Sequence, residues 1–402
     1  MVQHTLRDMF SSYVQKQGAF KDKNVLSHNY VPDVTFHREQ QTKALAEILS
    51  PVLRGLEVSN CFLYGKTGTG KTVVAMNVTS ELERTAKSVG KNLKVLYVNC
   101  KMKRVSDTEY RLLAELCRML GREVPPTGLP TDAVYAMFYE AVESVGGSVM
   151  LVLDEIDALV SKIGDEILYN LTRMNQRLAG TKVSMIGISN SVSFIEALDP
   201  RVKSALSEEE IIFQPYNSMQ LKDILTQRAD LAFAPSAIKP GVIEKCAALA
   251  AQEHGDARKA LDLLRIAGEI AERNGSPAVG IEHVDIAEDK LDTDRMVEIV
   301  RSQPKQSLAV LAAVIKLIDS KREGIQTGDV FTLYAEMCSR AGLKVLTQRR
   351  TSDLIAELDM LGVITTSVIS KGRYGRTREI RMVLPPPVIE KIRSILRESY
   401  LL

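Results

Sequence analysis

Eight consecutive residues, from Gly65 to Thr72, have the types and spacing of a phosphate-binding loop. They read Gly-Lys-Thr-Gly-Thr-Gly-Lys-Thr, which fits the pattern G-x-x-x-x-G-K-[ST]. Glycines allow successive backbone N–H groups to point at one anion, and the N-terminus of a following helix adds the positive end of its dipole. We expect ATP or ADP to be bound by Gly65, Lys66, Thr67, Gly68, Thr69, Gly70, Lys71 and Thr72.

The metal ion of a nucleotide bound there needs a second protein group that holds it. Asp154 and Glu155 directly follow an apolar segment, residues 149–153. We expect Thr72 to ligate Mg²⁺, Asp154 to hold the ion through water, and Glu155 to orient or deprotonate the attacking water. In-line hydrolysis of a phosphate ester needs little beyond such positioning and charge neutralisation.

Three more polar residues have positions from which they could act on the phosphates. Asn190 follows an expected strand and could touch the γ-phosphate or the water, although it could also simply form a turn. Arg201 is a candidate arginine finger, acting in the same site or in a neighbouring subunit, and its alternative is a surface salt bridge. Arg258 would lie in the first turn of a helix capped by Asp256, where it could distinguish ATP from ADP unless it is an ordinary surface arginine.

The surrounding elements fit a parallel sheet that positions these residues. Apolar segments read as strands, and segments with helical spacing separate them, which predicts an α/β fold whose sheet is covered on both faces. The expected strands are residues 60–64, 93–99, 149–153, 183–188 and 211–213, and the expected helices are 73–84, 107–120, 131–145 and 164–178. Residues 218–295 then have helical spacing throughout.

The C-terminal part has the order of a winged helix. Helices are expected over residues 305–320, 327–340 and 348–361, followed by strands at 363–369 and 379–384. Residues 301–402 carry 17 Lys/Arg and 10 Asp/Glu, a net charge of +7, whereas the rest of the chain carries −5. A basic module on a mildly acidic body indicates a polyanionic partner for the module.

Polar and basic residues lie where a winged helix meets duplex DNA. The expected DNA-binding residues are Lys344, Gln348, Arg349, Arg350 and Thr351 near the start of the third helix, and Lys371, Arg373, Tyr374 and Arg376 in the wing. Base readout is expected from Gln348, Arg349 or Thr351, and the other contacts would be to phosphates. The alternative is a winged helix that binds protein.

Composition limits the class of protein and its cellular location. Apolar residues make up 45% of the 402 residues and charged residues 25%, as in ordinary globular proteins. No apolar run approaches the roughly 20 residues of a membrane span, so we expect no membrane partner. The five cysteines lack paired spacing, which argues against a zinc site and a disulfide framework. We therefore expect a reducing, cytoplasmic location associated with the nucleoid.

Together these segments resemble the AAA+ ATPases. Within that class the chain resembles the archaeal replication initiators, a family similar to the largest subunit of the eukaryotic origin recognition complex and to the cell-division-cycle helicase loader. The resemblance covers nearly the whole chain. It rests on residues 37–41, 65–72, 153–157, 199–204 and 255–260, and on Asn190.

The resemblance also assigns two further segments. Residues 108–145 match an insertion that separates initiators from other AAA+ proteins and that contacts duplex DNA at its tip, which implies roles for Arg122, Thr127 and Gly128. The alternative for this segment is a plain surface hairpin of helices. Residues 25–34, with Tyr30 and Pro32, resemble the strap on the adenine side of the family's nucleotide, where contacts are expected to be packing and backbone bonds.

The resemblance implies an ATP-dependent replication initiator that binds origin duplex DNA and helps to load the replicative helicase, with slow ATP hydrolysis. Other initiator paralogues on the same DNA are further expected partners. We expect an AAA+ base over residues 1–215 with the insertion at about 104–145, a helical lid over 216–298 and a winged helix over 299–402. Two alternatives are a promoter-binding AAA+ regulator and a nucleotide-bound structural DNA-binding protein without significant turnover.

Overall fold

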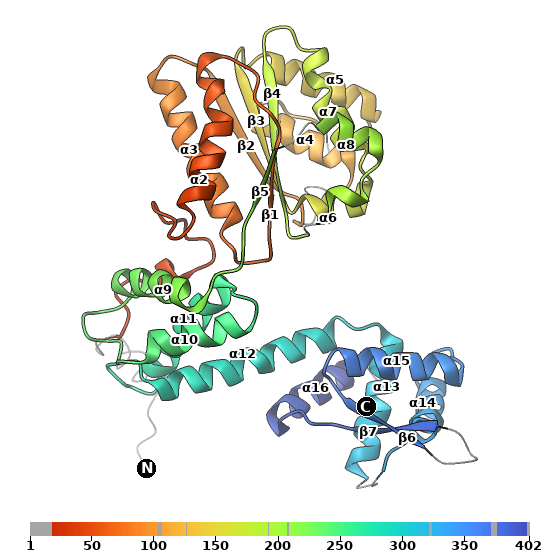
Figure 1. The fold of residues 1–402 in the computed structure, drawn as a ribbon. Coiled ribbons are helices and arrows are strands. Elements are labelled where there is room, and N and C mark those ends of the chain that lie inside the picture. Colours follow the sequence, from red (N-terminus) through yellow and green to blue (C-terminus); the bar gives the residue numbers. More distant parts are fainter. Residues whose placement is uncertain are drawn as a thin grey trace, which may run out of the picture. The chain divides into compact units, whose positions relative to one another are not determined.

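The structure of the chain is a computed structural model (Figure 1), and it divides into two compact units, residues 1–284 and 285–402. The predicted fold class, an α/β base with a parallel sheet, an all-helical lid and a winged helix, is confirmed. The domain boundaries expected from the sequence remain a prediction. The structure describes residues 18–102, 107–125, 127–191, 193–206, 209–320, 324–370 and 376–399.

A five-stranded parallel sheet forms the centre of the first unit. Its order is β2-β3-β4-β1-β5, so β1, which leads into the phosphate loop, lies between β4 and β5. Because ligands of open α/β sheets bind beyond the carboxyl ends of the strands, this order places the loop beside the ends of β3 and β4. The strands are β1 (Cys61–Tyr64), β2 (Leu93–Asn99), β3 (Ser148–Asp154), β4 (Lys182–Ser189) and β5 (Glu209–Ile212).

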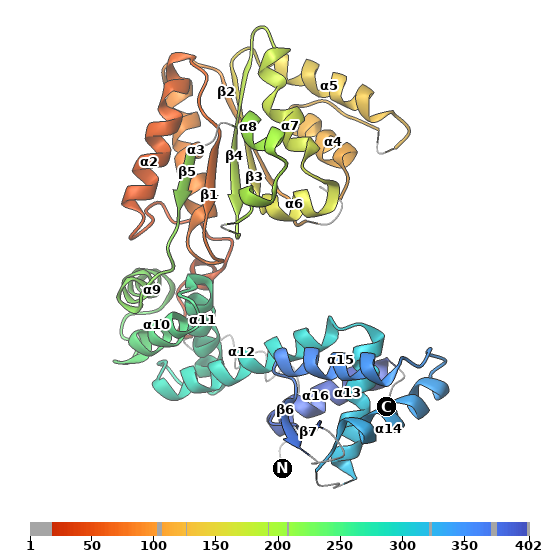
Figure 2. The ribbon, with the colours of Figure 1, turned by 45° about the vertical axis from the view of Figure 1, so that its right-hand side comes forward.

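Helices cover both faces of this sheet (Figures 1 and 2). One face is covered by α2 (Glu39–Leu49) and α3 (Lys71–Ser88). The other face is covered by α4 (Glu109–Met119), α5 (Thr131–Glu143), α6 (Ile156–Ile163), α7 (Glu166–Thr172) and α8 (Pro200–Leu206).

Two helix predictions in this unit need correction. The expected helix 164–178 is shorter, because α7 ends at Thr172 and only a 3-10 turn, Met174–Gln176, follows it. The expected helix 73–84 starts earlier and ends later, because α3 begins directly at Lys71 in the loop and continues to Ser88.

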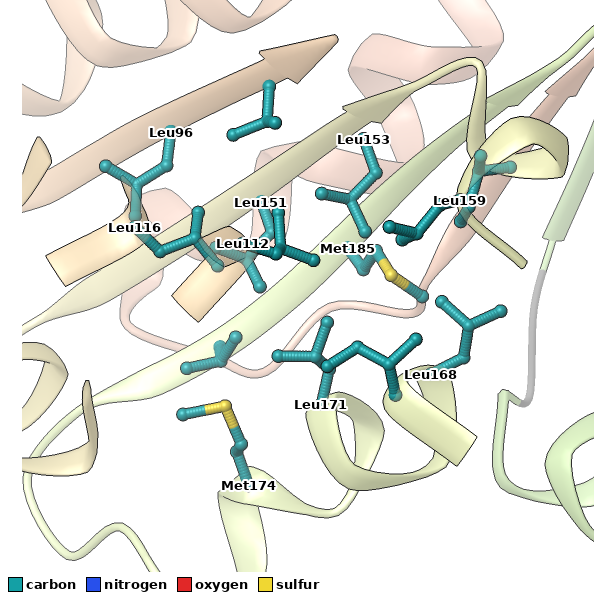
Figure 3. Packing of buried hydrophobic residues seen from close by; sticks show 14 of the residues in the cluster. Leu96, Leu112, Leu116, Leu151, Leu153, Leu159, Leu168, Leu171, Met174 and Met185 are labelled. Carbon is teal, nitrogen blue, oxygen red and sulfur yellow. The ribbon is translucent and has the colours of Figure 1, made fainter. Parts of the chain in front are cut away.

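The core fixes the strand that carries the expected metal-binding carboxylate (Figure 3). Leu151 and Leu153 of β3 pack with Met185 of β4 against Leu112 of α4 and Leu168 of α7, and all five side chains are at most 3% exposed. Burying such a side chain contributes roughly 1.5–3 kcal/mol to folding. Asp154, the next residue after Leu153, therefore extends from a firmly anchored strand.

Helices also form the rest of the first unit. Asn217 and Gln220 form a reciprocal capping box at the start of α9, and Asp256 caps α11 by accepting from Arg258 N. Both caps satisfy backbone donors that the first turn of a helix leaves free. The helices are α9 (Ser218–Ala232), α10 (Val242–Gln252) and α11 (Ala257–Arg273), followed by α12 (Ile281–Arg301), which continues into the second unit. Within the described ranges, none of the helices could cross a membrane, since each is too short or too polar.

The second unit has the expected order of three helices and a two-stranded antiparallel sheet. The strands pair from Thr365 with Arg381 to Ser370 with Arg376, so the return strand lies three residues earlier than the predicted 379–384. A last helix, α16, was not predicted. The elements are α13 (Lys305–Asp319), α14 (Thr327–Arg340), α15 (Gln348–Met360), β6 (Thr365–Ser370), β7 (Arg376–Arg381) and α16 (Pro386–Glu398).

Candidate nucleotide site and nucleic-acid interface

A pocket of about 450 Å³ opens at the carboxyl ends of the central strands of the first unit. Its wall is built from the N-terminal strap, the phosphate loop, the ends of β3 and β4, and helices α9 and α11. Eleven of the expected nucleotide-site residues line it, namely Tyr30, Pro32, Gly68, Thr69, Gly70, Lys71, Thr72, Asp154, Glu155, Asn190 and Arg258. Gly65, Lys66, Thr67 and Arg201 are not among the residues that line it.

The loop holds Lys71 at the base of the pocket. Lys71 is 5% exposed, and its Nζ donates to Gly65 O at 2.6 Å, Lys66 O at 2.8 Å and Asn190 Oδ1 at 3.1 Å. Gly65 and Lys66 therefore contribute through their carbonyls. Burial lowers the pKa of Lys71 to about 8 against the opposing pull of Asp154, and the charge of Arg258 lowers it further.

Arg38, whose role was not predicted from the sequence, forms a hydrogen bond to the phosphate loop. It is 3% exposed, its Nε donates to Thr69 O at 2.9 Å, and its Nη2 donates to Gln214 O. The guanidinium lies 3.9 Å from the ring centroid of Tyr216, a cation–π contact. Arg38 belongs to one of the segments that carry the family resemblance, which was the available signal, but a buried cation cannot be inferred from helical spacing.

Three donors surround the carboxylate of Asp154. Its Oδ2 accepts from Thr72 Oγ1 at 2.9 Å and from Tyr97 Oη at 2.8 Å, and its Oδ1 accepts from Glu155 N at 2.9 Å. Sequence reasoning missed Tyr97. The strand register explains its role, because Asn99 of β2 lies level with Asp154 of β3 and strand alternation places Tyr97 on the same face as Asn99. This register cannot be inferred from the sequence. Burial, with the nearby charge of Asp154, raises the pKa of Tyr97.

Glu155 has the backbone strain often found at functional sites. Its φ is 55°, a left-handed conformation that costs a non-glycine residue about 1–3 kcal/mol. Its side chain is 21% exposed and forms a 3.6 Å ion pair with Lys101. The following residue begins α6, so the strained residue links the anchored strand to a helix and lies in the wall of the pocket.

The amino terminus of α11 touches the phosphate loop directly. Ala257 N donates to Gly68 O at 3.2 Å, and a Cβ added at Gly68 would lie 1.7 Å from Asp256 Oδ1. Glycine is therefore required at position 68 for this close approach. Asp256 caps α11 as predicted, and Arg258 in the first turn lines the pocket.

Arg201 lies elsewhere on the same unit. Its side chain is 84% exposed, and Nε lies 3.1 Å from Asp199 Oδ1. Because it does not line the pocket, the expectation of a finger acting in its own site is not met by this geometry. The exposed position leaves the expectation of action in a neighbouring subunit open to test.

The strap closes the other end of the pocket. The Tyr30 ring lies 4.4 Å from the guanidinium of Arg228, which is 6% exposed and donates from Nη1 to Val25 O at 3.3 Å. Burial lowers the pKa of Arg228. Pro32 O accepts from Asn77 Nδ2 of α3 at 2.8 Å. Sequence reasoning missed both Arg228 and Asn77, since each reads as an ordinary helix residue.

The donor set fits a magnesium ion. The Thr72 hydroxyl and the Asp154 carboxylate adjoin the loop, and the described residues contain no cluster of three or more His, Cys, Asp or Glu side chains that would make a cage for a metal ion. Mg²⁺ is usually held by one or two protein oxygens, with substrate phosphates and water completing its shell. Thr72 and Asp154 would hold such an ion.

The start of α15 in the winged helix presents basic and polar side chains to solvent. Thr347 caps this helix by accepting from Arg350 N at 3.3 Å. Arg350 forms ion pairs with Asp353 at 3.8 Å and Glu357 at 3.3 Å. Lys344, Gln348, Arg349 and Arg350 are all exposed.

Thr351 does not fit the expectation of base readout. Its side chain is fully buried, and its hydroxyl donates to Thr347 O at 3.2 Å. The helix turns this residue toward the core of the unit, beside Leu354 and Ile355. The expected wing contacts Lys371, Arg373 and Tyr374 lie outside the described residues. Arg376 begins β7 opposite Ser370, and only its backbone is described.

The insertion forms a helical hairpin whose tip joins α4 to α5. Arg122 forms a 2.6 Å ion pair with Glu140, Thr127 is exposed, and Gly128 has a φ of 103° with open space around it. Tyr110 Oη donates to Pro125 O at 2.5 Å and ties the tip to α4. The three expected DNA-contact residues thus lie in the one loop that joins α4 to α5, although Arg122 already forms an ion pair with Glu140.

Comparisons with known proteins place this architecture in a family. The AAA domain family matches residues 57–193, the Cdc6 AAA+ ATPase-type lid domain matches residues 222–289, and the CDC6 C-terminal winged helix domain matches residues 298–392. These three segments contain the loop, the helices that cover it, and the exposed start of α15.

Whole-chain relatives agree with these domains. The ORC1-type DNA replication protein of Pyrococcus abyssi is 51% identical over 98% of this chain and 94% of its own length. The ORC1-type DNA replication protein 1 of Methanosarcina mazei is 49% identical with the same coverage. A solved structure of the Aeropyrum pernix ORC1 protein in complex with DNA is 45% identical, covers 95% of this chain and 97% of its own, and has a TM-score of 0.79. The resemblance seen in the sequence is thereby confirmed, and the chain belongs to the family of ORC1-type DNA replication proteins.

Proposed function

We propose that this chain is an ATP-dependent initiator of DNA replication. It binds origin duplex DNA through its winged helix and the tip of its insertion, and it helps to load the replicative helicase. Support comes from the family, whose relatives are named DNA replication proteins, and from a 45% identical relative solved in complex with DNA. Other initiator paralogues bound to the same DNA are further partners.

One observation carries the nucleotide part of the proposal. Lys71, the adjacent residues Asp154 and Glu155, Asn190 and Arg258 come from four separate places in the sequence and line one pocket. Lys71 binds the β- and γ-phosphates, and Asn190 and Arg258 contact the γ-phosphate and so distinguish ATP from ADP. Glu155 orients or deprotonates the water that attacks.

Thr72 and Asp154 hold Mg²⁺ in this proposal. The ion, when bound, neutralises charge on the phosphate oxygens. The phosphate loop, Gly65 to Thr72, supplies backbone donors for the same oxygens, and Tyr30 and Pro32 of the strap lie on the adenine side. Residues 1–215, 216–298 and 299–402 act respectively as base, lid and winged helix.

Hydrolysis is slow in the isolated chain. Arg201 does not line the pocket of its own chain, and an arginine finger is worth about 10³–10⁵ in rate in phosphoryl-transfer enzymes. A neighbouring subunit would have to supply that residue. The chain therefore acts as a switch that holds DNA differently with ATP and ADP, rather than as a fast motor.

The DNA part depends on the exposed cations at the start of α15. Among the described residues, Arg350 is shared with two carboxylates, whereas Arg349 is exposed and no ion pair is found for its side chain. Of the two arginines in the first turn of α15, Arg349 is thus the one more available to a phosphate or a base edge. Lys344 and Gln348 flank it, and Lys371, Arg373, Tyr374 and Arg376 are proposed to bind from the wing.

The test is duplex binding by the full chain, measured by fluorescence anisotropy over a range of salt concentrations. Arg349→Ala should weaken binding, and if Arg349 contacts a phosphate it should reduce the salt slope by about one. Arg397→Ala, which removes an exposed arginine of α16 in the same unit, is the charge-matched control and should change little. Equal effects of both variants would reject a specific role for α15.

A further inference from the structure

The carboxylate of Asp154 is held from more sides than its proposed role as a metal ligand requires. Glu155 N donates to Oδ1 at 2.9 Å, while Thr72 Oγ1 and Tyr97 Oη donate to Oδ2 at 2.9 Å and 2.8 Å. These contacts hold the plane of the carboxylate in one orientation. Of the two side-chain donors, Thr72 belongs to the phosphate loop and Tyr97 does not.

The two side-chain donors differ in what a bound ion would do to them. Under the proposed function, on which this inference rests, the Thr72 hydroxyl offers a lone pair to Mg²⁺ and can still donate its hydrogen to Asp154, so its position depends on the ion as well as on the carboxylate. Tyr97 is not a ligand of the ion. It is the side chain that orients the carboxylate independently of the ion and of the phosphate loop.

The fold gives Tyr97 a fixed position for this task. It lies on β2, whose register sets Tyr97 beside Val152 and Asn99 beside Asp154. The neighbouring residues Leu96 and Val98 point into the core on the opposite face and are at most 3% exposed. The Tyr97 ring itself packs against the apolar cluster that contains Val74 of α3, and its hydroxyl reaches the pocket.

The hydroxyl also remains a donor. A phenol has an ordinary pKa of about 10, so the Tyr97 hydroxyl carries its proton near neutral pH and donates it to Asp154 Oδ2. A neutral donor next to an ionised carboxylate forms a charge-assisted hydrogen bond, which is stronger than one between neutral groups.

We propose that Tyr97 is a positioning residue of the magnesium site, which holds Asp154 in the orientation that binds the nucleotide-bound ion. Groups that orient a metal ligand from behind are often worth 10- to 100-fold in metal affinity. Tyr97 would therefore set how much Mg²⁺ the chain needs in order to hold ATP, without contacting either the ion or the nucleotide.

The experiment is the binding of ATP to the full chain by isothermal titration calorimetry at a series of free Mg²⁺ concentrations, and in EDTA. Tyr97→Phe removes only the hydroxyl. It should raise the Mg²⁺ concentration at half-maximal effect by about tenfold or more, while affinity in EDTA stays within about twofold of wild type because the phosphate loop is intact. The EDTA arm thus also shows that the variant's pocket is correctly folded.

Tyr135→Phe is the matched control, because Tyr135 Oη likewise donates to a carboxylate, that of Glu109, in the insertion and outside the pocket. It should leave the Mg²⁺ midpoint unchanged. An unshifted midpoint in Tyr97→Phe, an equal loss with and without Mg²⁺, or the same shift in Tyr135→Phe would each overturn the inference. If the wild-type chain bound no ATP at any Mg²⁺ concentration, the proposed function itself would fall and this inference with it.

Discussion

The ammonium group of Lys71 is nearly inaccessible to solvent, and it donates to oxygens of Gly65, Lys66 and Asn190. Its pKa of about 8 lies below the ordinary 10.5, chiefly because of burial. Between these two values the folded chain binds fewer protons than the unfolded chain. Burying this charge therefore destabilises the fold below about pH 8, and the penalty is relieved as pH rises toward 10.5.

This shift predicts a pH dependence of nucleotide binding. Phosphates bind the protonated form of Lys71, so the affinity for ADP should be flat below about pH 7.5 and should fall above pH 8, by up to about tenfold per pH unit. Fluorescence titration with a labelled ADP between pH 7 and 9.5 measures it. Lys71→Arg is the control, since a guanidinium stays charged over this range. The same pH profile in both chains would contradict the assignment to Lys71.

Single residues show which parts of the site can be predicted from sequence. Lys71 and Asp154 follow from the spacing of a local motif, because loop, strand end and helix start are contiguous in the chain. Tyr97, Arg38 and Arg228 do not, because their roles depend on contacts between elements far apart in sequence, and each residue type is common on surfaces. The prediction for Thr351 was wrong for a different reason. Thr351 is a polar residue at the expected end of the helix, but its side chain faces the core.

At the scale of elements, most strands were predicted within one or two residues, whereas β7 lies three residues earlier than predicted and four helices, α2, α6, α8 and α16, were not predicted. Buried parallel strands are continuous apolar runs with clear ends. Helix α6 is only eight residues long and begins directly after the strained Glu155, so no loop sequence separates it from the preceding strand. Helix α16 follows Pro385 and begins with Pro386 and Pro387; prolines often end a structured segment, yet in a first turn their missing N–H costs nothing.

The start of α11 links helix stability to the nucleotide pocket, which yields a prediction. Asp256→Ala removes the cap on Arg258 N and the carboxylate that lies close to Gly68 of the phosphate loop. It should lower the free energy of unfolding by about 1 kcal/mol and also weaken nucleotide binding. Denaturant titration and nucleotide titration measure the two effects.

Asn217→Ala is the matched control, because Asn217 caps α9 by accepting from Gln220 N at 2.9 Å and does not line the pocket. It should have a similar cost in stability and leave nucleotide affinity within about twofold, since cap losses of this kind are local. If both variants weakened nucleotide binding equally, the effect would come from general loss of stability rather than from the contact between α11 and the loop.

At the scale of the whole molecule, the proposed catalytic residues are divided between the pocket and the surface. Glu155 lines the pocket, whereas Arg201 lies on α8 with 84% of its side chain exposed and forms an ion pair with Asp199. A finger can act at a distance only if a second chain brings it to the phosphates. Under this proposal, turnover would require assembly of several copies on DNA.

This division predicts complementation between two inactive chains. Glu155→Ala should abolish hydrolysis because it removes the residue that prepares the water, and Arg201→Ala should reduce assembled turnover by about 10³-fold or more if it acts as a finger. In a mixture on duplex DNA, the intact Glu155 site of one variant can meet the intact Arg201 of the other. Single-turnover release of phosphate should therefore return to a measurable fraction of the wild-type rate.

Arg177→Ala, which removes another exposed arginine of the same unit, is the control and should hydrolyse ATP at the wild-type rate without a second variant. A mixture as inactive as its two components would show that Arg201 does not serve a neighbouring site.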